Sequence, residues 1–155
     1  GKLYVVPFQD IQVAIRDHCT DSNRVVLYRR MMYRIAHALA ELKNCQGLVT
    51  GESVGQVASQ TLKNLMAVSC VVPMSVLRPL IGMNKQEIIT QAKKIGTYDI
   101  SIEPQPDCCS VFMPDHPSTN CKIKYLEADE RLYPWEELKS NALDSVETID
   151  LDDLD

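Results

Sequence analysis

The sequence predicts an α/β fold in which helices flank a parallel β-sheet. Short apolar, β-prone runs alternate along the chain with longer runs at helical spacing, the order typical of such folds. One short run, at positions 48–50, leads into a loop with two glycines, and helical periodicity resumes after it. In open α/β sheets, ligands bind against loops of this kind at the carboxyl ends of strands. With 155 residues and 45% hydrophobic content, the chain is long enough for one domain with a core.

The first part of the chain supplies two strands and two helices. Residues 3–6 form an apolar run that ends at Pro7 and predicts a buried strand, and residues 8–18 predict a helix. Gly47 suits the end of the next helix, so residues 48–50 predict the second strand. That helix, over residues 25–43, has the strongest pattern, an apolar stripe of Leu27, Met31, Ile35, Leu39 and Leu42.

The middle of the chain continues the alternation. In the helix after the glycine loop, the side chains expected to face the core are those of Leu62, Leu65, Met66 and either Val68 or Ser69. The next strand is expected in the second half of residues 71–77, because Pro73 cannot donate to a regular central ladder. Asn84 and Glu87 have the spacing of a capping box, which predicts a helix start there. This helix is expected to end at Gly96 and to bury Ile88, Ile89, Ala92 and Ile95.

The last third of the chain is less regular. Residues 103–120 contain four prolines and predict a loop with one short strand near positions 110–112. Residues 123–138 are weakly helical. The acidic residues 143–155 are expected to form a disordered tail. The expected organisation is therefore one folded part, residues 1–142, followed by that tail.

Net charge and cysteine content argue against several classes of protein. The net charge of −5 is unusual for a free-standing nucleic-acid binder, which normally has a basic excess. No apolar run is long enough to cross a membrane, and the first residues do not have the layout of a signal peptide. The six cysteines are irregularly spaced in a chain rich in helix formers, which favours reduced thiols over a disulfide scaffold. We therefore expect a cytoplasmic protein.

The glycine loop at positions 50–61 is the first candidate site. Its glycines would let backbone N–H groups approach a ligand, and the start of the following helix favours negative charge. Gln56 and Gln60 are four residues apart and could share a helix face directed at a nucleobase or ribose. By spacing alone, a plain strand-to-helix turn with polar caps is favoured over nucleotide binding.

Four segments, in order, resemble the ThiI family, the tRNA 4-thiouridine synthetases. The glycine loop reads TGESVGQVASQT and is similar to the family signature TGES-x-GQVASQT. Before it, RRMM at positions 29–32 resembles a basic-Arg-Met-Met helix of the family. After it, LRPLIGMNKQEII at 77–89 and DCCSV at 107–111 resemble two further family segments. The resemblance covers nearly the whole chain.

The resemblance implies a fold and a reaction. The fold would be the adenine-nucleotide α-hydrolase type, a Rossmann-like parallel sheet flanked by helices. Family members use ATP, with which Mg²⁺ is expected, to adenylate the C4 oxygen of uridine 8 in tRNA. A cysteine persulfide then delivers sulfur, and AMP leaves. A cysteine desulfurase is the implied sulfur donor, and the same sulfur route feeds the thiazole of thiamine in many bacteria.

Several positions match residues that contact the nucleotide in the family. The resemblance implies this role for Arg29, Gly51 and Gln60, and Gln56 is included from its place in the loop. Lys85 matches a functionally important lysine of the family. A lysine in the first turn of a helix lies at the positive end of the dipole, which is unfavourable without an anion nearby. The alternative is that Lys85 simply points into water, at little cost.

The adjacent pair Cys108 and Cys109 is the candidate sulfur carrier. Cys109 precedes Ser110, as in the family's Cys-small-Val loop, so the resemblance assigns the persulfide to Cys109. One residue of slip would assign it to Cys108 instead. Other interpretations are a pair of loop thiols without a role, or zinc bound with His116 and Cys121. Adjacent cysteines are awkward chelators and the chain has no C-x-x-C, so no metal site is expected.

The largest departure from the family is the pyrophosphate loop, S-G-G-x-D-S, which does not occur in these 155 residues. We therefore expect the chain to be the later part of the catalytic domain, without its first strand and PP-loop. On that interpretation tRNA binds mainly through a preceding region, and the chain alone is inactive. An exposed sheet edge could pair with a second copy, giving a homodimer. The alternatives are another ATP-dependent adenylating enzyme, or a nucleotide-binding module without catalysis.

Overall fold

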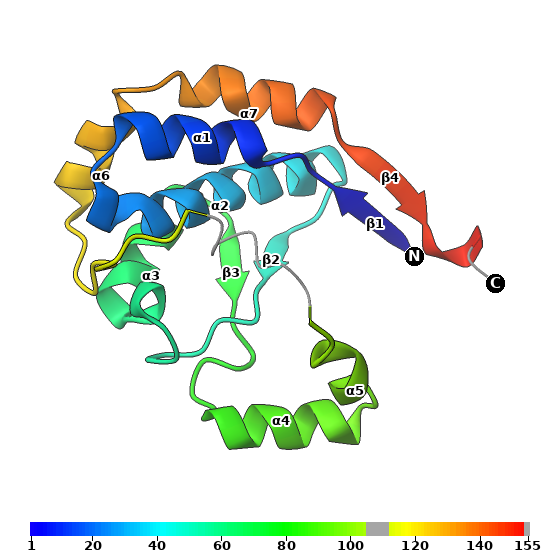
Figure 1. Ribbon diagram of the computed structural model, residues 1–155. Helices are drawn as coiled ribbons and strands as arrows, with labels where there is room; N and C mark the ends of the chain where they lie inside the picture. The colour runs from blue at the N-terminus through cyan, green and yellow to red at the C-terminus, as the bar shows by residue number, and fades with distance from the viewer. Residues whose placement is uncertain (105–111, 154–155) are drawn as a thin grey trace.

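Three long helices form the main layer of the protein. The computed structural model describes residues 1–104 and 112–153. In Figure 1, α1 (Gln9–His18), α2 (Arg24–Leu42) and α7 (Trp135–Asp144) lie side by side. Two shorter helices, α3 (Leu62–Ser69) and α6 (Ile123–Glu130), pack at one end of this layer. Single turns of 3₁₀ helix are found at Asp21–Asn23, Ala58–Gln60 and Leu151–Asp153. Among the described residues, no helix is long and apolar enough to span a membrane.

Helix α2 forms the centre of the core. Leu27 and Met31 are fully buried and Ile35 nearly so, which confirms most of the expected apolar stripe. Leu39 packs on the core from a half-buried position. Leu42 is 71% exposed, because it is the last residue of the helix and lies beyond the packed layer.

A buried carboxylate joins α2 to α6. Glu130 accepts hydrogen bonds of 2.7 and 2.9 Å from Arg30 and of 2.6 and 3.0 Å from Arg34. Burial alone would raise the pKa of Glu130, but the two guanidinium groups lower it below its ordinary value. The Arg34 guanidinium also lies 4.3 Å from the centre of the Trp135 ring in α7. These contacts fix the position of α2, which carries Arg29 toward the candidate site.

The parallel sheet consists of β2 (Gly47–Val49) and β3 (Ser75–Leu77). Gly47 pairs with Ser75 and Val49 with Leu77. Thr50 N–H donates to the Leu77 carbonyl at 3.0 Å and extends the pairing past the strand ends. The parallel pairing and the late start of β3 after Pro73 confirm the α/β prediction for this part of the chain.

The other two strands form a separate antiparallel ribbon. β1 (Lys2–Val5) pairs with β4 (Glu147–Asp150), and the ribbon extends away from the helices (Figure 1). β1 confirms the strand expected at residues 3–6, but Leu3 is 48% exposed, so the expected burial of this strand is wrong. The acidic tail is not disordered at 147–150 either. Its backbone groups pair with β1, and the terminal amino group forms an ion pair with Asp152 at 2.8 Å.

Helix α3 buries a narrower face than expected. Leu65 and Val68 are buried as predicted. Leu62 and Met66 are 70% and 61% exposed, and their predicted inward orientation is wrong. In the first turn of the helix, Asn64 is the residue that faces inward. Its side-chain amide donates to the carbonyls of Ala58 and Ser118 at 2.8 Å each. Asn64 therefore ties the first turn of α3 to the segments around Ala58 and Ser118.

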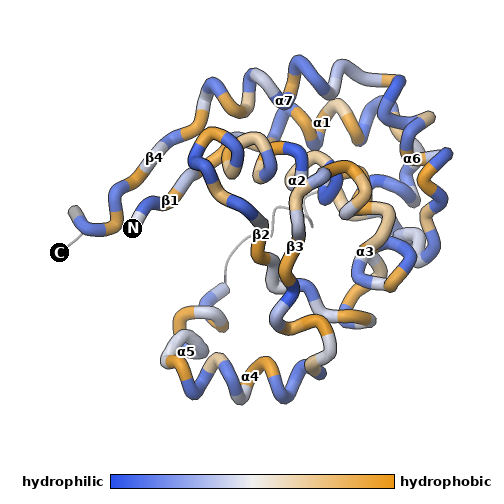
Figure 2. Tube along the Cα trace, turned by 180° about the vertical axis from the view of Figure 1, so that it is seen from behind, coloured by the Kyte–Doolittle hydropathy of each residue, from blue (hydrophilic) through white to orange (hydrophobic). Residues whose placement is uncertain are grey.

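Helix α4 (Lys85–Lys94) begins as the sequence predicts. Asn84 Oδ1 accepts from the Glu87 N–H at 3.0 Å, and Glu87 Oε2 accepts from the Asn84 N–H at 2.7 Å. Gly96, at φ +76°, takes the left-handed conformation that ends the helix. The predicted buried face is wrong, because all ten residues of α4 are described and none of them is buried. The helix packs on α5 (Tyr98–Ser101), and the two lie apart from the helical layer in Figures 1 and 2.

Candidate functional site

The loop at positions 50–61 is closed by its own hydrogen bonds. Ser53 N–H donates to the Gln60 side-chain oxygen at 3.2 Å, and Gly55 N–H donates to the Gln60 carbonyl at 3.0 Å. Gly55 has φ +79°, a left-handed conformation that favours glycine. The helix starts only at Leu62, where Thr61 caps it through the Asn64 N–H. Gln60 therefore holds the loop in shape from a 3₁₀ turn.

The loop also places Glu52 under α2. Its carboxylate is 3% exposed and accepts hydrogen bonds from four side chains on three elements. Arg29 donates to Oε1, while Tyr33 and Thr50 donate to Oε2 at 2.6 and 3.0 Å. Arg78, which follows β3, donates to Oε2 at 2.5 Å. One carboxylate thus joins α2 to the carboxyl ends of both parallel strands.

The charge balance at Glu52 is positive. Burial alone would raise the pKa of Glu52, but hydrogen bonds from Tyr33 and Arg78 and the charge of Arg29 lower it below its ordinary value of 4.5. The carboxylate is therefore ionised at neutral pH. Two guanidinium groups share one carboxylate, so one positive charge is left over at this point of the fold.

A pocket of about 440 Å³ lies beside this network. Arg29, Ser59 and Gln60 supply its polar groups, and the remaining lining residues are Val25, Val57, Ala58, Met113 and Pro117. Its volume and its mostly apolar lining with a few polar groups are typical of small-molecule sites. Two expected nucleotide-contacting residues, Arg29 and Gln60, therefore lie in one pocket.

Arg29 has hydrogen-bonding capacity that the described residues do not use. Its Nη atoms bond Glu52 and, at 3.4 Å, the Ser59 hydroxyl. Its Nε is buried and has no partner among the described residues. An N–H group left in this state is costly unless a ligand or water accepts from it. Gly51 lies just before Glu52, and a Cβ built on it would meet no atom within 4 Å.

A second loop, after β3, packs on the first. Ser53 Oγ donates to the Met83 carbonyl at 2.6 Å, and Val54 N–H donates to the Ile81 carbonyl at 3.1 Å. These bonds hold the start of α4 beside the glycine loop. Lys85, the first residue of α4, is exposed and does not line the pocket of Arg29 and Gln60.

The comparisons with known proteins agree with one another. A sequence model of the family described as "Thiamine biosynthesis protein (ThiI)" matches residues 1–133. The chain belongs to the ThiI family. It is 46% identical over 148 residues to a "Probable tRNA sulfurtransferase" of Moorella thermoacetica, covering 96% of the chain and 38% of that relative. A protein of the same name from Halothermothrix orenii is 51% identical over 132 residues, 84% of the chain and 33% of its own length.

A solved structure matches the fold as well. The chain superimposes with a TM-score of 0.87 on a chain of the solved structure described as "Crystal structure of a 4-thiouridine synthetase - RNA complex with bound ATP". The two are 40% identical, and the match covers 96% of this chain and 39% of that one. The Rossmann-like fold type of this ThiI-family chain is therefore confirmed. The chain spans a little over a third of the length of the relatives that it matches.

Within this ThiI-family chain, the structure separates the expected site residues. Arg29 and Gln60 share the pocket, whereas Gly51 does not line it and precedes Glu52, which accepts from Arg29. Gln56 is exposed in a bend outside the helix, so the shared helix face expected for Gln56 and Gln60 does not exist. Lys85 begins helix α4, directly after the neighbouring loop.

Glu52, Tyr33 and Arg78 were not anticipated as site residues. A signal for them exists in the sequence. Arg29 and Tyr33 are four residues apart on one face of a predicted helix, and Glu52 and Arg78 each follow a predicted strand. The carboxyl ends of neighbouring parallel strands meet at one edge, so a carboxylate and a guanidinium there are expected to pair.

The cysteines divide into three groups, of which the exposed Cys45 and Cys70 form one. Cys108 and Cys109 lie outside the described residues. Burial raises the pKa of the Cys19 thiol to about 12, and burial also raises the pKa of Cys121. Neither is suited to nucleophilic sulfur chemistry, because the thiolate is the reactive form. Cys121 Sγ lies 3.5 Å from Asn23 Oδ1, and residues 1–104 and 112–153 contain no group of three potential ligands that could hold a metal.

Proposed function

We propose that this chain is the later part of the ATP-dependent catalytic domain of a tRNA sulfurtransferase. Such an enzyme adenylates uridine 8 of tRNA and replaces its C4 oxygen with sulfur to give 4-thiouridine. The observation that supports this most strongly is the match to an ATP-bound 4-thiouridine synthetase over 96% of the chain. The pocket of Arg29 and Gln60 gives the proposal a physical basis in this chain.

The pocket has the chemistry that an adenine nucleotide needs. Its apolar lining can accept a base, and Arg29 contributes a fixed positive charge with an unused N–H group. The net positive charge around Glu52 would stabilise phosphate groups during transfer. Gly51 leaves open space where a ligand can approach the backbone. The pyrophosphate loop would lie in a preceding part of the polypeptide, so the pocket is one part of the complete site.

Sulfur delivery is assigned to the segment that contains Cys108 and Cys109. Met113, which lines the pocket, follows Cys109 by four positions. We assign the persulfide to Cys109, with Cys108 as the alternative. Lys85 is assigned a role beside the phosphates because it begins α4, directly after the loop in which the Met83 carbonyl accepts from Ser53.

The remaining parts of the proposal come from the family resemblance and the relatives' names. Mg²⁺ would accompany ATP, and a cysteine desulfurase would load the persulfide. The substrate tRNA would be held mainly by a preceding region of the polypeptide. A cytoplasmic location, a homodimer and a contribution to thiamine thiazole synthesis complete the proposal.

The test is formation of 4-thiouridine in tRNA, read as retardation in a mercury-containing gel. The complete gene product, with ATP and a sulfur donor, should thiolate tRNA, and the 155-residue chain should not. An S-G-G-x-D-S string directly upstream in the gene is the matching sequence observation. Activity of the isolated chain would contradict the proposal that its phosphate loop lies elsewhere. If the complete protein instead adenylates a substrate without thiolating tRNA, another ATP-dependent adenylating enzyme is the better assignment.

A further inference from the structure

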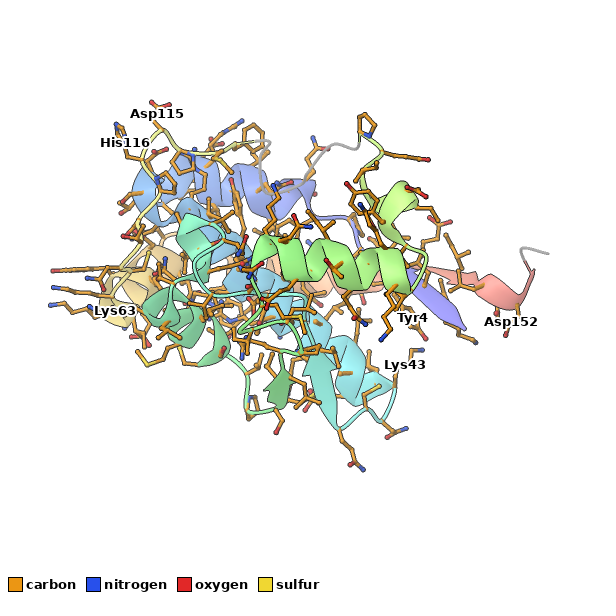
Figure 3. The ribbon with its side chains drawn as sticks, turned by 90° about the horizontal axis from the view of Figure 1, so that it is seen from below. Tyr4, Lys43, Lys63, Asp115, His116 and Asp152 are labelled. Carbon is orange, nitrogen blue, oxygen red and sulfur yellow. The ribbon has the colours of Figure 1, made fainter. Side chains whose placement is uncertain are left out.

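Two lysines flank an exposed tyrosine where α6 begins, and a third lies at the same end of the molecule (Figure 3). The Nζ atoms of Lys124 and Lys122 lie 4.8 and 6.0 Å from the centre of the Tyr125 ring, and Tyr125 is 52% exposed. Lys63 of α3 projects outward at the same end of the molecule (Figure 3). None of the three lysines forms an ion pair with a residue that the structure describes. We call these four residues the Tyr125 surface.

A pocket of about 500 Å³ adjoins the Tyr125 surface, and Lys122 and Tyr125 are among its lining residues. Its other side chains are mainly hydroxyls and amides, from Thr20, Ser22, Asn23, Ser118 and Asn120. Of these, Thr20 and Asn23 already bond Asp129, so Ser22, Ser118 and Asn120 are the side chains that can hydrogen-bond the polar edge of a neutral ring.

The carboxylate in this pocket is already occupied. Asp129 accepts from the Thr20 N–H at 3.3 Å, from the Thr20 hydroxyl at 2.9 Å and from the Asn23 amide at 2.9 Å. Its negative charge disfavours an anion deep in the pocket, whereas the lysines favour anions outside it. The arrangement suits a ligand with a neutral ring and flanking negative charges.

The chain connects this pocket to the pocket of Arg29. Met113 and Pro117 line the pocket of Arg29. Residues that follow them in the chain, Ser118 and Lys122 among them, line the pocket beside Tyr125. Hydrogen bonds hold this connection: Ser118 N–H donates to the Ser22 carbonyl at 2.9 Å, and Thr61 Oγ1 donates to the Thr119 carbonyl at 2.7 Å. A ligand long enough to occupy both sites would follow residues 113–122.

We propose that the Tyr125 surface and its pocket bind an unpaired segment of RNA. A base stacks on the exposed ring or enters the pocket, where amides and hydroxyls meet its edge, and the lysines bind the phosphates on either side. Exposed aromatic rings flanked by cations are the usual platform for unstacked bases. A local basic surface on a chain with net charge −5 also directs a polyanion to one face. The inference rests on the proposed function, since the RNA would be part of the substrate tRNA.

The test measures fluorescence anisotropy of a labelled single-stranded RNA of about ten nucleotides with the 155-residue chain. Lys122→Gln with Lys124→Gln should weaken binding about tenfold and reduce the slope of log K against log salt by about 1.4, from two lost phosphate contacts. Tyr125→Leu should weaken binding about tenfold through lost stacking. Lys93→Gln with Lys94→Gln on α4, the charge-matched control, should change it less than twofold. Circular dichroism verifies that each variant is folded.

Three results would overturn the inference. One is no binding of RNA by the unaltered chain at low salt. Another is an equal loss in the α4 control. The third is that Tyr125→Leu leaves the RNA affinity unchanged and the chain binds heparin as tightly as RNA. That pair of results would indicate a surface for any polyanion or for an acidic protein. ATP binding, measured on the same variants, should be unchanged. An Arg29→Gln chain that keeps its ATP affinity would contradict the proposed function and leave the RNA result standing.

Discussion

Arg29 and Glu52 form an ion pair that joins helix α2 to the loop after β2. Glu52 simultaneously binds Arg78 at the end of β3, so one buried carboxylate positions two cations. Because Arg29 also lines the pocket, the same contacts that hold the loop determine where a positive charge meets a ligand. Fold stability and the geometry of the site are therefore coupled at Glu52.

Glu52→Gln should lower the free energy of unfolding by about 3 kcal/mol, because two guanidinium groups lose their buried partner. Tyr33→Phe is the matched control. It removes one hydrogen bond to the same carboxylate and should cost about 1 kcal/mol. Urea unfolding followed by circular dichroism measures both. Equal losses in the two variants would show that the charge pairing contributes nothing beyond hydrogen bonding.

Arg29→Gln should weaken ATP binding about tenfold or more, because it removes a charged donor from the pocket. Arg131→Gln makes the same charge change at an exposed position and should leave the affinity unchanged. Titration with a fluorescent ATP analogue measures both. Arg29→Lys keeps the charge but not the planar fork, and we expect an intermediate affinity. A similar loss in Arg29→Gln and Arg131→Gln would mean that only net charge matters.

Stability should fall when the pH drops below about 4.5. The pKa values of Glu52 and Glu130 are both lowered in the folded chain, so the stability they contribute is fully present above their ordinary value of 4.5. It is lost as the pH falls through the lowered folded-state values. Unfolding free energies measured between about pH 3 and pH 7 should show a plateau and then this loss. In Glu130→Gln, the unfolding free energy should fall less steeply at acid pH. An unchanged fall would contradict the link between the pKa of Glu130 and stability.

Features set by nearby residues could be predicted from the sequence. The capping box of Asn84 and Glu87 and the apolar stripe of α2 depend on spacing within one helix, and both are present. The carboxyl-end loop at 50–61 was found because Gly51 and Gly55 follow a β-prone run.

Features set by distant partners could not be predicted. β4 looks like an acidic tail until β1 pairs with it across nearly the whole chain. Ile88 and Ile95 repeat at helical spacing, but burial needs a neighbouring element, and Ile95 is 62% exposed. The partners of Glu52 likewise come from three separate elements.

Lys85→Ala should leave the urea midpoint unchanged, because Lys85 is exposed and makes no ion pair with any described residue. In the complete gene product it should reduce tRNA thiolation at least about tenfold, the scale of a lost charged contact to phosphate. Lys94→Ala, at the other end of the same helix, is the control and should keep full activity. Full activity of Lys85→Ala would mean that this lysine only faces solvent.

Alkylation and substitution of the cysteines should separate the reactive thiols from the buried ones. Alkylation of the folded chain at about pH 8 should spare Cys19, whose pKa of about 12 leaves almost no thiolate, and the buried Cys121. The exposed Cys45 and Cys70 should react, and mass spectrometry identifies the sites. In the complete gene product, Cys109→Ala should abolish persulfide trapping and tRNA thiolation.

Cys108→Ala is the control for the Cys109 assignment and should retain both activities. The reverse pattern would assign the persulfide to Cys108, since the two neighbours differ by only one position in the loop. Retention of sulfur transfer in both variants would exclude this loop as the carrier. Cys45 and Cys70 would then be the candidates among the described residues, because burial keeps Cys19 and Cys121 protonated.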